Sequence, residues 1–200
     1  MATMKLFYSA NSPYARKVRV LAIERGLTDE IELIEVSTAD PSDALLDANP
    51  LGRVPALMTA ADGAIHDSPL ICEYLDGYIA SQAHAGRVLS LDDKRLTATA
   101  QGMLDAGYAV RMEKTRPNDL QWQAWTDKQF SKINRTLDQL ETDAESLPTE
   151  ATLGAITLAC TLEWLMFRHA EGQWLANRPK LAAWSEAFGQ RASMTATQPA

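Results

Sequence analysis

Two Ser-Pro pairs, Ser12-Pro13 and Ser68-Pro69, are the features of this chain best suited to binding an anion. Serine is a preferred helix N-cap, and proline suits the first helical position. A helix N-terminus offers unpaired backbone N–H groups and a partial positive charge to an anion, and the serine hydroxyl adds another donor. Asp67, next to the second pair, supplies a carboxylate for an ammonium group. Each pair by itself is typical of a plain helix cap, so a binding role depends on the elements around it.

Short strands and helices alternate in the pattern of residues 1–80. Ser12 is expected to cap a helix that begins at Pro13 and stops at Gly26, and Asp62-Gly63 is expected to form a hairpin turn. The resulting order is βαβαββα, with a parallel crossover between the first two strands. The predicted strands are 5–9, 31–36, 56–60 and 64–66, and the further helices are 43–48 and 69–80.

The second half of the chain has the period of long helices and is predicted to be all-α. The polar stretch 81–87 is interpreted as a linker, which divides the chain into domains 1–80 and 88–200. The predicted helices of the second domain, separated by prolines, are 95–114, 119–145, 153–169 and 180–191.

Composition excludes several classes of protein. The net charge of −7 gives no support to a surface for nucleic acid. Two cysteines are too few for a disulfide framework, and the three histidines lack metal-ligand spacing, so no metal is expected. No run of apolar residues is long enough to cross a membrane, and no targeting segment is visible. A cytoplasmic protein without nucleic-acid or membrane partners is therefore expected.

Four motifs lie in order along the chain: KLFYSANSPYARKVRVLAIERG (5–26), NPLGRVPAL (49–57), DSPLICEYLDGYI (67–79) and RASMTATQP (191–199). Together they resemble the glutathione transferase superfamily in its serine-type branches, over essentially the whole chain. The resemblance implies a thioredoxin-like α/β N-terminal domain and an all-α C-terminal domain. It also implies that the chain reads Ser-Pro-Tyr-Ala where thioredoxins have Cys-x-x-Cys, so the protein's own cysteines do not exchange disulfides.

The resemblance implies that Ser12 is the catalytic residue and that glutathione is the co-substrate. A thiol with a pKa of about 8.5 is mostly protonated at neutral pH, and lowering that pKa to about 6.5 requires roughly 2.7 kcal/mol. A hydrogen bond to a charged group contributes about 1.5–3 kcal/mol, and a helix N-terminus adds about 0.3–1 kcal/mol. Ser12 therefore donates to the sulfur and need not act as a nucleophile. Ser9, Asn11 and Tyr8 remain alternatives, because branches of the family place this group at different points of the segment.

The other implied site residues bind the ends of glutathione or the second substrate. A cis Val54-Pro55 bond leaves the Val54 backbone to pair with the peptide, Arg53 meets the glycyl carboxylate, and Asp67 and Ser68 hold the γ-glutamyl group. The pocket for a small apolar electrophile is expected to involve Asn11, Tyr108 and Arg111, and Asp105 is expected to approach the glutathione amino group across a dimer interface.

The resemblance implies a homodimeric glutathione transferase that conjugates glutathione to an electrophile, as in detoxification. A non-catalytic binding or regulatory module and a glutathione-dependent isomerase or reductase remain alternatives. One departure concerns the family's capping box in the second domain, where Thr152 is present but Ala155 replaces the usual Asp and Gly154 lies between them. The expected consequence is a loss of about 0.5–2 kcal/mol of local stability.

Overall fold

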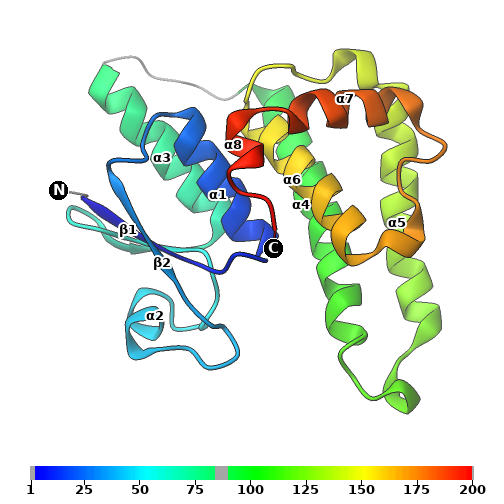
Figure 1. Ribbon diagram of the computed structural model, residues 1–200, viewed down its shortest axis with the longest axis horizontal. Coiled ribbons are helices and arrows are strands. Elements are labelled where there is room, and N and C mark those ends of the chain that lie inside the picture. The colour runs from blue at the N-terminus through cyan, green and yellow to red at the C-terminus, as the bar shows by residue number, and fades with distance from the viewer. Residues whose placement is uncertain (1–2, 84–89, 200) are drawn as a thin grey trace. The chain divides into compact units, whose positions relative to one another are not determined.

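The apolar run near the N-terminus forms an inner strand of a four-stranded sheet (Figure 1). This computed structural model describes residues 3–83 and 90–199. Strand β1 (Met4–Tyr8) pairs in parallel with β2 (Ile31–Glu35) and antiparallel with β3 (Ala56–Thr59). The hairpin partner of β3 is β4 (Gly63–Ile65), so the strand order is β2-β1-β3-β4.

Within the described residues 3–83, three helices accompany the strands and confirm the predicted βαβαββα order. They are α1 (Pro13–Glu24), α2 (Asp43–Ala48) and α3 (Ser68–Ala83). Helices α1 and α3 lie on one face of the sheet and α2 lies at the other (Figure 1). Helix α3 includes the first three residues of the predicted linker, and 84–87 lie outside the described residues.

Four long helices form the second part of the chain, close to their predicted ranges. They are α4 (Leu91–Glu113), α5 (Gln123–Thr142), α6 (Leu153–Arg168) and α7 (Pro179–Gly189). The helix predicted to begin at residue 119 begins later, because η1 (Asn118–Leu120) is a separate 3-10 turn. Two more such turns are η2 (Ala144–Ser146) and η3 (Ala170–Gly172).

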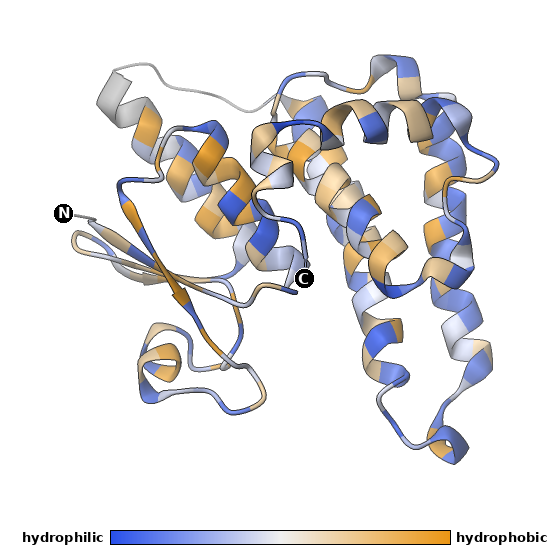
Figure 2. Cartoon of the chain, viewed as in Figure 1, coloured by the Kyte–Doolittle hydropathy of each residue, from blue (hydrophilic) through white to orange (hydrophobic). Residues whose placement is uncertain are grey.

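The burial of apolar side chains explains how the helices of this part of the chain pack. Helix α5 buries a stripe that includes Ile133, Leu137 and Leu140, and Figure 2 shows hydrophobic and hydrophilic residues alternating along it. Helix α6 is buried on almost every side and forms the core of this part of the chain.

Contacts divide the chain into two compact units, one of Met1–Leu89 with Ala192–Ala200 and the other of Ser90–Arg191. The short helix α8 (Ala192–Thr195) thus packs with the α/β unit although it follows the helical one in sequence. The buried Arg16 of α1 donates from Nε to Thr197 Oγ1 at 3.3 Å and from Nη2 to the Met194 carbonyl at 3.2 Å. Ser193 Oγ also donates to the Glu24 carboxylate at 2.5 Å. The C-terminal segment therefore holds α1, the helix that Ser12 caps.

The N-terminus of α6 is capped differently from the expectation. Thr152 Oγ1 accepts from the Ala155 N–H at 3.2 Å, as a normal N-cap does. The Thr152 N–H donates to the Glu150 carbonyl at 2.8 Å, and the buried Asp93 of α4 accepts from the Gly154 N–H at 2.9 Å. A carboxylate from another helix thus supplies the negative charge that position 155 lacks, which the sequence-based expectation of a weakened cap did not include.

Candidate functional site

Three loops leave the sheet at the same end, and they carry the site residues predicted for the α/β unit. Phe7, near the end of β1, pairs with Ala56 at the start of β3, and Leu57 pairs with Ile65 at the end of β4. The loops before α1, before β3 and before α3 therefore meet at one edge. Since α1 and α3 both begin there, two helix N-termini with their partial positive charges point to this edge.

Ser12 is the N-cap of α1, as predicted. Its Oγ accepts from the Ala15 N–H at 3.2 Å, and its carbonyl accepts from the Arg16 N–H at 2.9 Å. The side chain is half-buried. Because the oxygen acts as acceptor in this cap, the hydroxyl hydrogen is left to donate to another atom.

The alternatives to Ser12 have different surroundings. The carbonyl of Ser9 accepts from the Ser12 N–H at 3.1 Å, so Ser9 helps to shape the turn. Asn11 is exposed at the tip of that turn. The ring of Tyr8 lies 4.6 Å from the guanidinium of Arg19. Ser9 and Asn11 thus lie in the loop before α1, and Tyr8 is the last residue of β1. These contacts do not choose among the alternatives.

Asn49, which sequence reasoning did not single out, organises the loop before β3. Its buried side chain donates from Nδ2 to the Arg53 carbonyl at 2.9 Å and accepts at Oδ1 from the Leu51 N–H at 3.1 Å. The Gly52 N–H also donates to the Asn49 carbonyl at 2.8 Å, and Gly52 has a positive φ of 61°. An Asn directly before Pro-Leu-Gly is the signal for such an Asx turn.

Val54 has the backbone arrangement that the resemblance implied. The Val54-Pro55 bond is cis, and the Val54 side chain packs against the cluster of Phe7, Leu45, Ala48 and Ala56. Among the described residues, no hydrogen bond engages the N–H or the C=O of Val54. Both groups are therefore free to pair with an extended peptide. Arg53 is exposed beside them.

The loop before α3 brings Asp67 and Ser68 to the helix N-terminus. Helix α3 begins at Ser68, one residue earlier than predicted, and the Asp67 carbonyl accepts from the Ile71 N–H at 2.9 Å. The Asp67 side chain is exposed and Ser68 is almost completely buried. The bond between His66 and Asp67 is also cis.

The residues predicted for the electrophile pocket in the helical unit lie on α4. Tyr108 is 42% exposed, and its ring centroid lies 6.4 Å from that of Trp164 on α6. Arg111 follows one turn later and is half-buried. Asp105 is exposed and accepts from Gln101 Nε2 at 3.0 Å.

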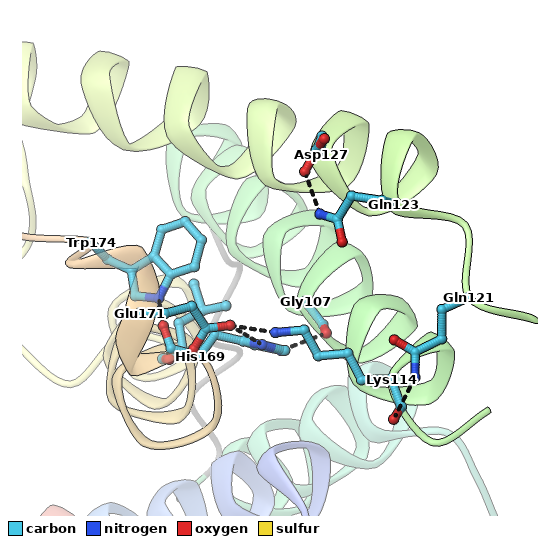
Figure 3. A network of polar contacts seen from close by, with 9 residues as sticks. Gly107, Lys114, Gln121, Gln123, Asp127, His169, Glu171 and Trp174 are labelled. Carbon is cyan, nitrogen blue, oxygen red and sulfur yellow. Dashed lines mark hydrogen bonds and ion pairs between the residues drawn. The ribbon is translucent and has the colours of Figure 1, made fainter. Parts of the chain in front are cut away.

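A second polar cluster lies inside the helical unit around His169 (Figure 3). His169 is fully buried, and its Nε2 lies 3.0 Å from the Gly107 carbonyl, so this nitrogen carries the proton. Its Nδ1 has no hydrogen-bond partner among the described residues and lies 3.7 Å from Glu171 Oε1, which Lys114 binds. The rings of Phe130 and Trp164 meet the imidazole edge-on at 5.4 and 5.6 Å.

Burial lowers the pKa of His169 below its ordinary value of 6.5, although the hydrogen bond to Gly107 opposes this effect. The unfolded chain therefore takes up a proton near pH 6.5 while the folded chain stays neutral, so stability falls as the pH drops through that value. We expect the wild-type melting temperature to decrease more between about pH 7.5 and about pH 5.5 than that of His169→Gln. Thermal denaturation at both pH values checks this, and equal decreases in the two proteins would contradict it.

The described residues contain no group of three or more His, Cys, Asp or Glu side chains placed to hold a metal ion. Within the same part of the chain, no helix combines the length and the apolar character needed to cross a membrane.

A thioredoxin-like sheet with two helix N-termini at one edge, joined in sequence to a helical unit, defines the glutathione transferase class. The family model "Glutathione S-transferase, N-terminal domain" matches residues 11–77, and "Glutathione S-transferase, C-terminal domain" matches residues 123–187. The chain is 34% identical to an uncharacterized GST-like protein, YibF, of Escherichia coli (strain K12), over 98% of each chain. The chain belongs to the glutathione S-transferase family, which confirms the predicted family and fold.

Solved structures agree with this assignment. A glutathione transferase family member from Pseudomonas fluorescens Pf-5 with bound glutathione has a TM-score of 0.89 at 38% identity, covering 98% of this chain and 99% of that one. A structure of a family member from the same organism with bound S-(propanoic acid)-glutathione has a TM-score of 0.84 at 35% identity, covering 98% and 97%.

Proposed function

We propose that this protein is a glutathione transferase in which Ser12 stabilises the thiolate of bound glutathione for attack on an electrophilic small molecule. The observation that carries the proposal is the cap geometry of Ser12, whose oxygen accepts from the Ala15 N–H while its hydroxyl hydrogen stays free to donate. The N-terminus of α1 adds its positive potential at the same point.

The rest of the sheet edge suits the remaining groups of glutathione. The N–H and C=O of Val54 pair with the backbone of the cysteinyl residue, as a neighbouring strand would. The N-terminus of α3 and Ser68 bind the γ-glutamyl carboxylate, Asp67 binds its ammonium group, and Arg53 meets the glycyl carboxylate. Glutathione bound in the Pseudomonas fluorescens Pf-5 relative supports this assignment.

Conjugation is favoured over binding alone because a relative also holds glutathione that carries a propanoic acid group on its sulfur. In the proposed reaction, the thiolate sulfur forms a bond to an electrophilic carbon and the leaving group departs with its electron pair. The pocket for this electrophile is assigned to Asn11, Tyr108 and Arg111. We further propose a cytoplasmic homodimer that acts in detoxification, with Asp105 reaching the glutathione of the partner protomer.

Adding glutathione to the wild-type protein is expected to produce a thiolate absorbance near 240 nm with a midpoint at about pH 6.5, against about 8.5 for a free thiol. Calorimetry measures glutathione binding in parallel. Binding without a thiolate signal would favour a non-catalytic module, and no binding at millimolar glutathione would reject the proposal. A thiolate signal with regeneration of free glutathione during turnover would indicate an isomerase.

A further inference from the structure

Helices α4 and α6 run side by side in the same direction within the helical unit (Figure 1). Thr161 Oγ1 donates to the Ala100 carbonyl at 3.3 Å, and His169 Nε2 lies 3.0 Å from the Gly107 carbonyl. Residues about 61 positions apart are therefore level with each other on the two helices. This register places Gly107 of α4 level with Arg168, the last residue of α6, so that α4 continues past the end of α6.

Apolar side chains remain exposed near the end of α6 and on the last turns of α4. Tyr108 and Met112 are 42% and 48% exposed and share one face of α4 by their four-residue spacing. Phe167 of α6 is 42% exposed. We call Tyr108, Met112 and Phe167 the α4–α6 patch. Aromatic and thioether side chains in such a patch suit an aromatic ligand.

Two arginines border this patch. Arg111 is one turn from Tyr108 on α4, and Arg168 is one turn from Trp164, the residue of α6 whose ring faces Tyr108. The Arg168 guanidinium lies 4.3 Å from the ring centroid of Phe167. Burial lowers the pKa of Arg168, and the nearby charge of Arg111 lowers it further. Two guanidinium groups thus lie close enough to repel each other.

Among the described residues, no carboxylate forms an ion pair with Arg111 or Arg168. Acidic side chains on the adjacent turns are engaged elsewhere, since Glu113 pairs with Arg116 at 3.1 Å and Glu171 pairs with Lys114. Within the part of the chain that the structure describes, no carboxylate in ion-pair contact offsets the repulsion between the two arginines, and an anion bound between them would offset it.

We propose that Arg111 and Arg168 form an anion-binding pair beside the α4–α6 patch and that the second substrate is an aromatic or apolar electrophile that carries a carboxylate. The guanidinium fork matches a carboxylate through two parallel hydrogen bonds, while the patch contacts the apolar body. This inference rests on the proposed function only where it calls the ligand a substrate. The anion-binding site itself lies within the helical unit and does not depend on glutathione binding. The carboxylate stays unchanged during conjugation.

Binding of unreactive probes tests the pair without requiring catalysis. Calorimetry compares 3-nitrobenzoate with its neutral analogue 3-nitrobenzamide on the full chain. The wild type is expected to bind the benzoate about tenfold more tightly. Arg111→Gln and Arg168→Gln are each expected to remove most of this preference. Arg135→Gln, which changes an exposed arginine of α5, is the matched control and keeps the preference.

Absence of a preference for the benzoate in the wild type, or its survival in both arginine variants, would overturn the inference. Turnover of 4-chloro-3-nitrobenzoate and of the corresponding amide then separates the two proposals. In this reaction the glutathione sulfur bonds to the ring carbon and chloride leaves. A binding preference without any conjugation would leave the anion site in place and reject the transferase. Conjugation of both compounds at equal kcat/KM would reject the anion site and keep the transferase.

Discussion

Replacing Ser12 with alanine is expected to raise the pKa of the thiol of bound glutathione by one to two units and to lower kcat/KM about tenfold to hundredfold near pH 6.5. The hydroxyl donates to an anion, and such a hydrogen bond contributes about 1.5–3 kcal/mol. One pKa unit corresponds to about 1.4 kcal/mol. The thiolate absorbance near 240 nm, followed against pH, measures this change, and the pH profile of kcat/KM should shift by the same amount.

The Ser12 substitution also removes the cap of α1, so a control must separate the two effects. Ser12 Oγ accepts from the Ala15 N–H at 3.2 Å. Alanine at an N-cap costs about 0.5–2 kcal/mol, whereas glycine costs only a few tenths. Ser12→Gly should therefore keep most of the stability of α1 and still lose the thiolate signal. Ser12→Thr keeps the hydroxyl and should retain the signal.

Substitution of Ser9 and Asn11, the alternatives in the loop before α1, shows which result would contradict this prediction. Ser9→Ala and Asn11→Ala are expected to leave the pKa of the bound thiol within a few tenths of a unit of the wild-type value. If either of them removes the thiolate absorbance while Ser12→Ala keeps it, the activating group lies elsewhere in the segment. Glutathione binding in all the variants would then still support the sheet edge as the site.

The strand and helix order of the α/β unit was predictable because its signals are local. Ser12 and Ser42 cap α1 and α2 by accepting from the N–H three residues later, an interaction encoded within a single turn. The start of α5 was predicted too early, because the separate turn η1 precedes it. There the Glu113 carboxylate accepts from the Trp122 N–H at 2.8 Å. That contact joins the last residue of α4 to the N-cap residue of α5, and helical periodicity does not reveal it.

The candidate site likewise combines features that local sequence patterns predict with features that depend on contacts between distant residues. The two Ser-Pro pairs pointed to helix N-termini, and the strand pairing then places both at one edge of the sheet. Sequence reasoning missed Asn49, whose side chain shapes the loop of Val54, and Arg16, which contacts Thr197 from 181 positions away. Arg168 was also missed, because its closeness to Arg111 depends on the register of α4 and α6. Contacts between distant residues follow from packing and not from a local pattern.

Asp93→Ala is expected to destabilise the helical unit by about 2–4 kcal/mol. The Asp93 carboxylate is buried and accepts from the Gly154 N–H at the first turn of α6. Without it, this backbone donor loses a charge-assisted hydrogen bond, worth about 1.5–3 kcal/mol. The N-terminus of α6 also loses a favourable charge, worth about 0.3–1 kcal/mol. Denaturant unfolding, with the slope compared between proteins, measures the difference.

Asp92→Ala is the matched control, because Asp92 precedes Asp93 in the first turn of α4 but its side chain is 90% exposed and pairs with Arg95. It should leave the midpoint of unfolding nearly unchanged. Asp93→Asn keeps an acceptor oxygen without the charge and should show an intermediate loss. Equal effects of Asp92→Ala and Asp93→Ala would assign the loss to the start of α4 rather than to α6.

The glycine at position 154 follows from the same contact. A Cβ there would lie 2.8 Å from Asp93 Oδ1, 2.9 Å from the Asp93 carbonyl oxygen and 3.0 Å from Leu96 Cβ. Gly154→Ala should therefore destabilise the protein even though alanine favours a helix by about 1 kcal/mol. Because the Asp93 carbonyl belongs to the backbone of α4, the clash persists when the side chain is shortened. Gly154→Ala should thus remain destabilising in an Asp93→Ala background, but by less, since one of its close contacts is then gone.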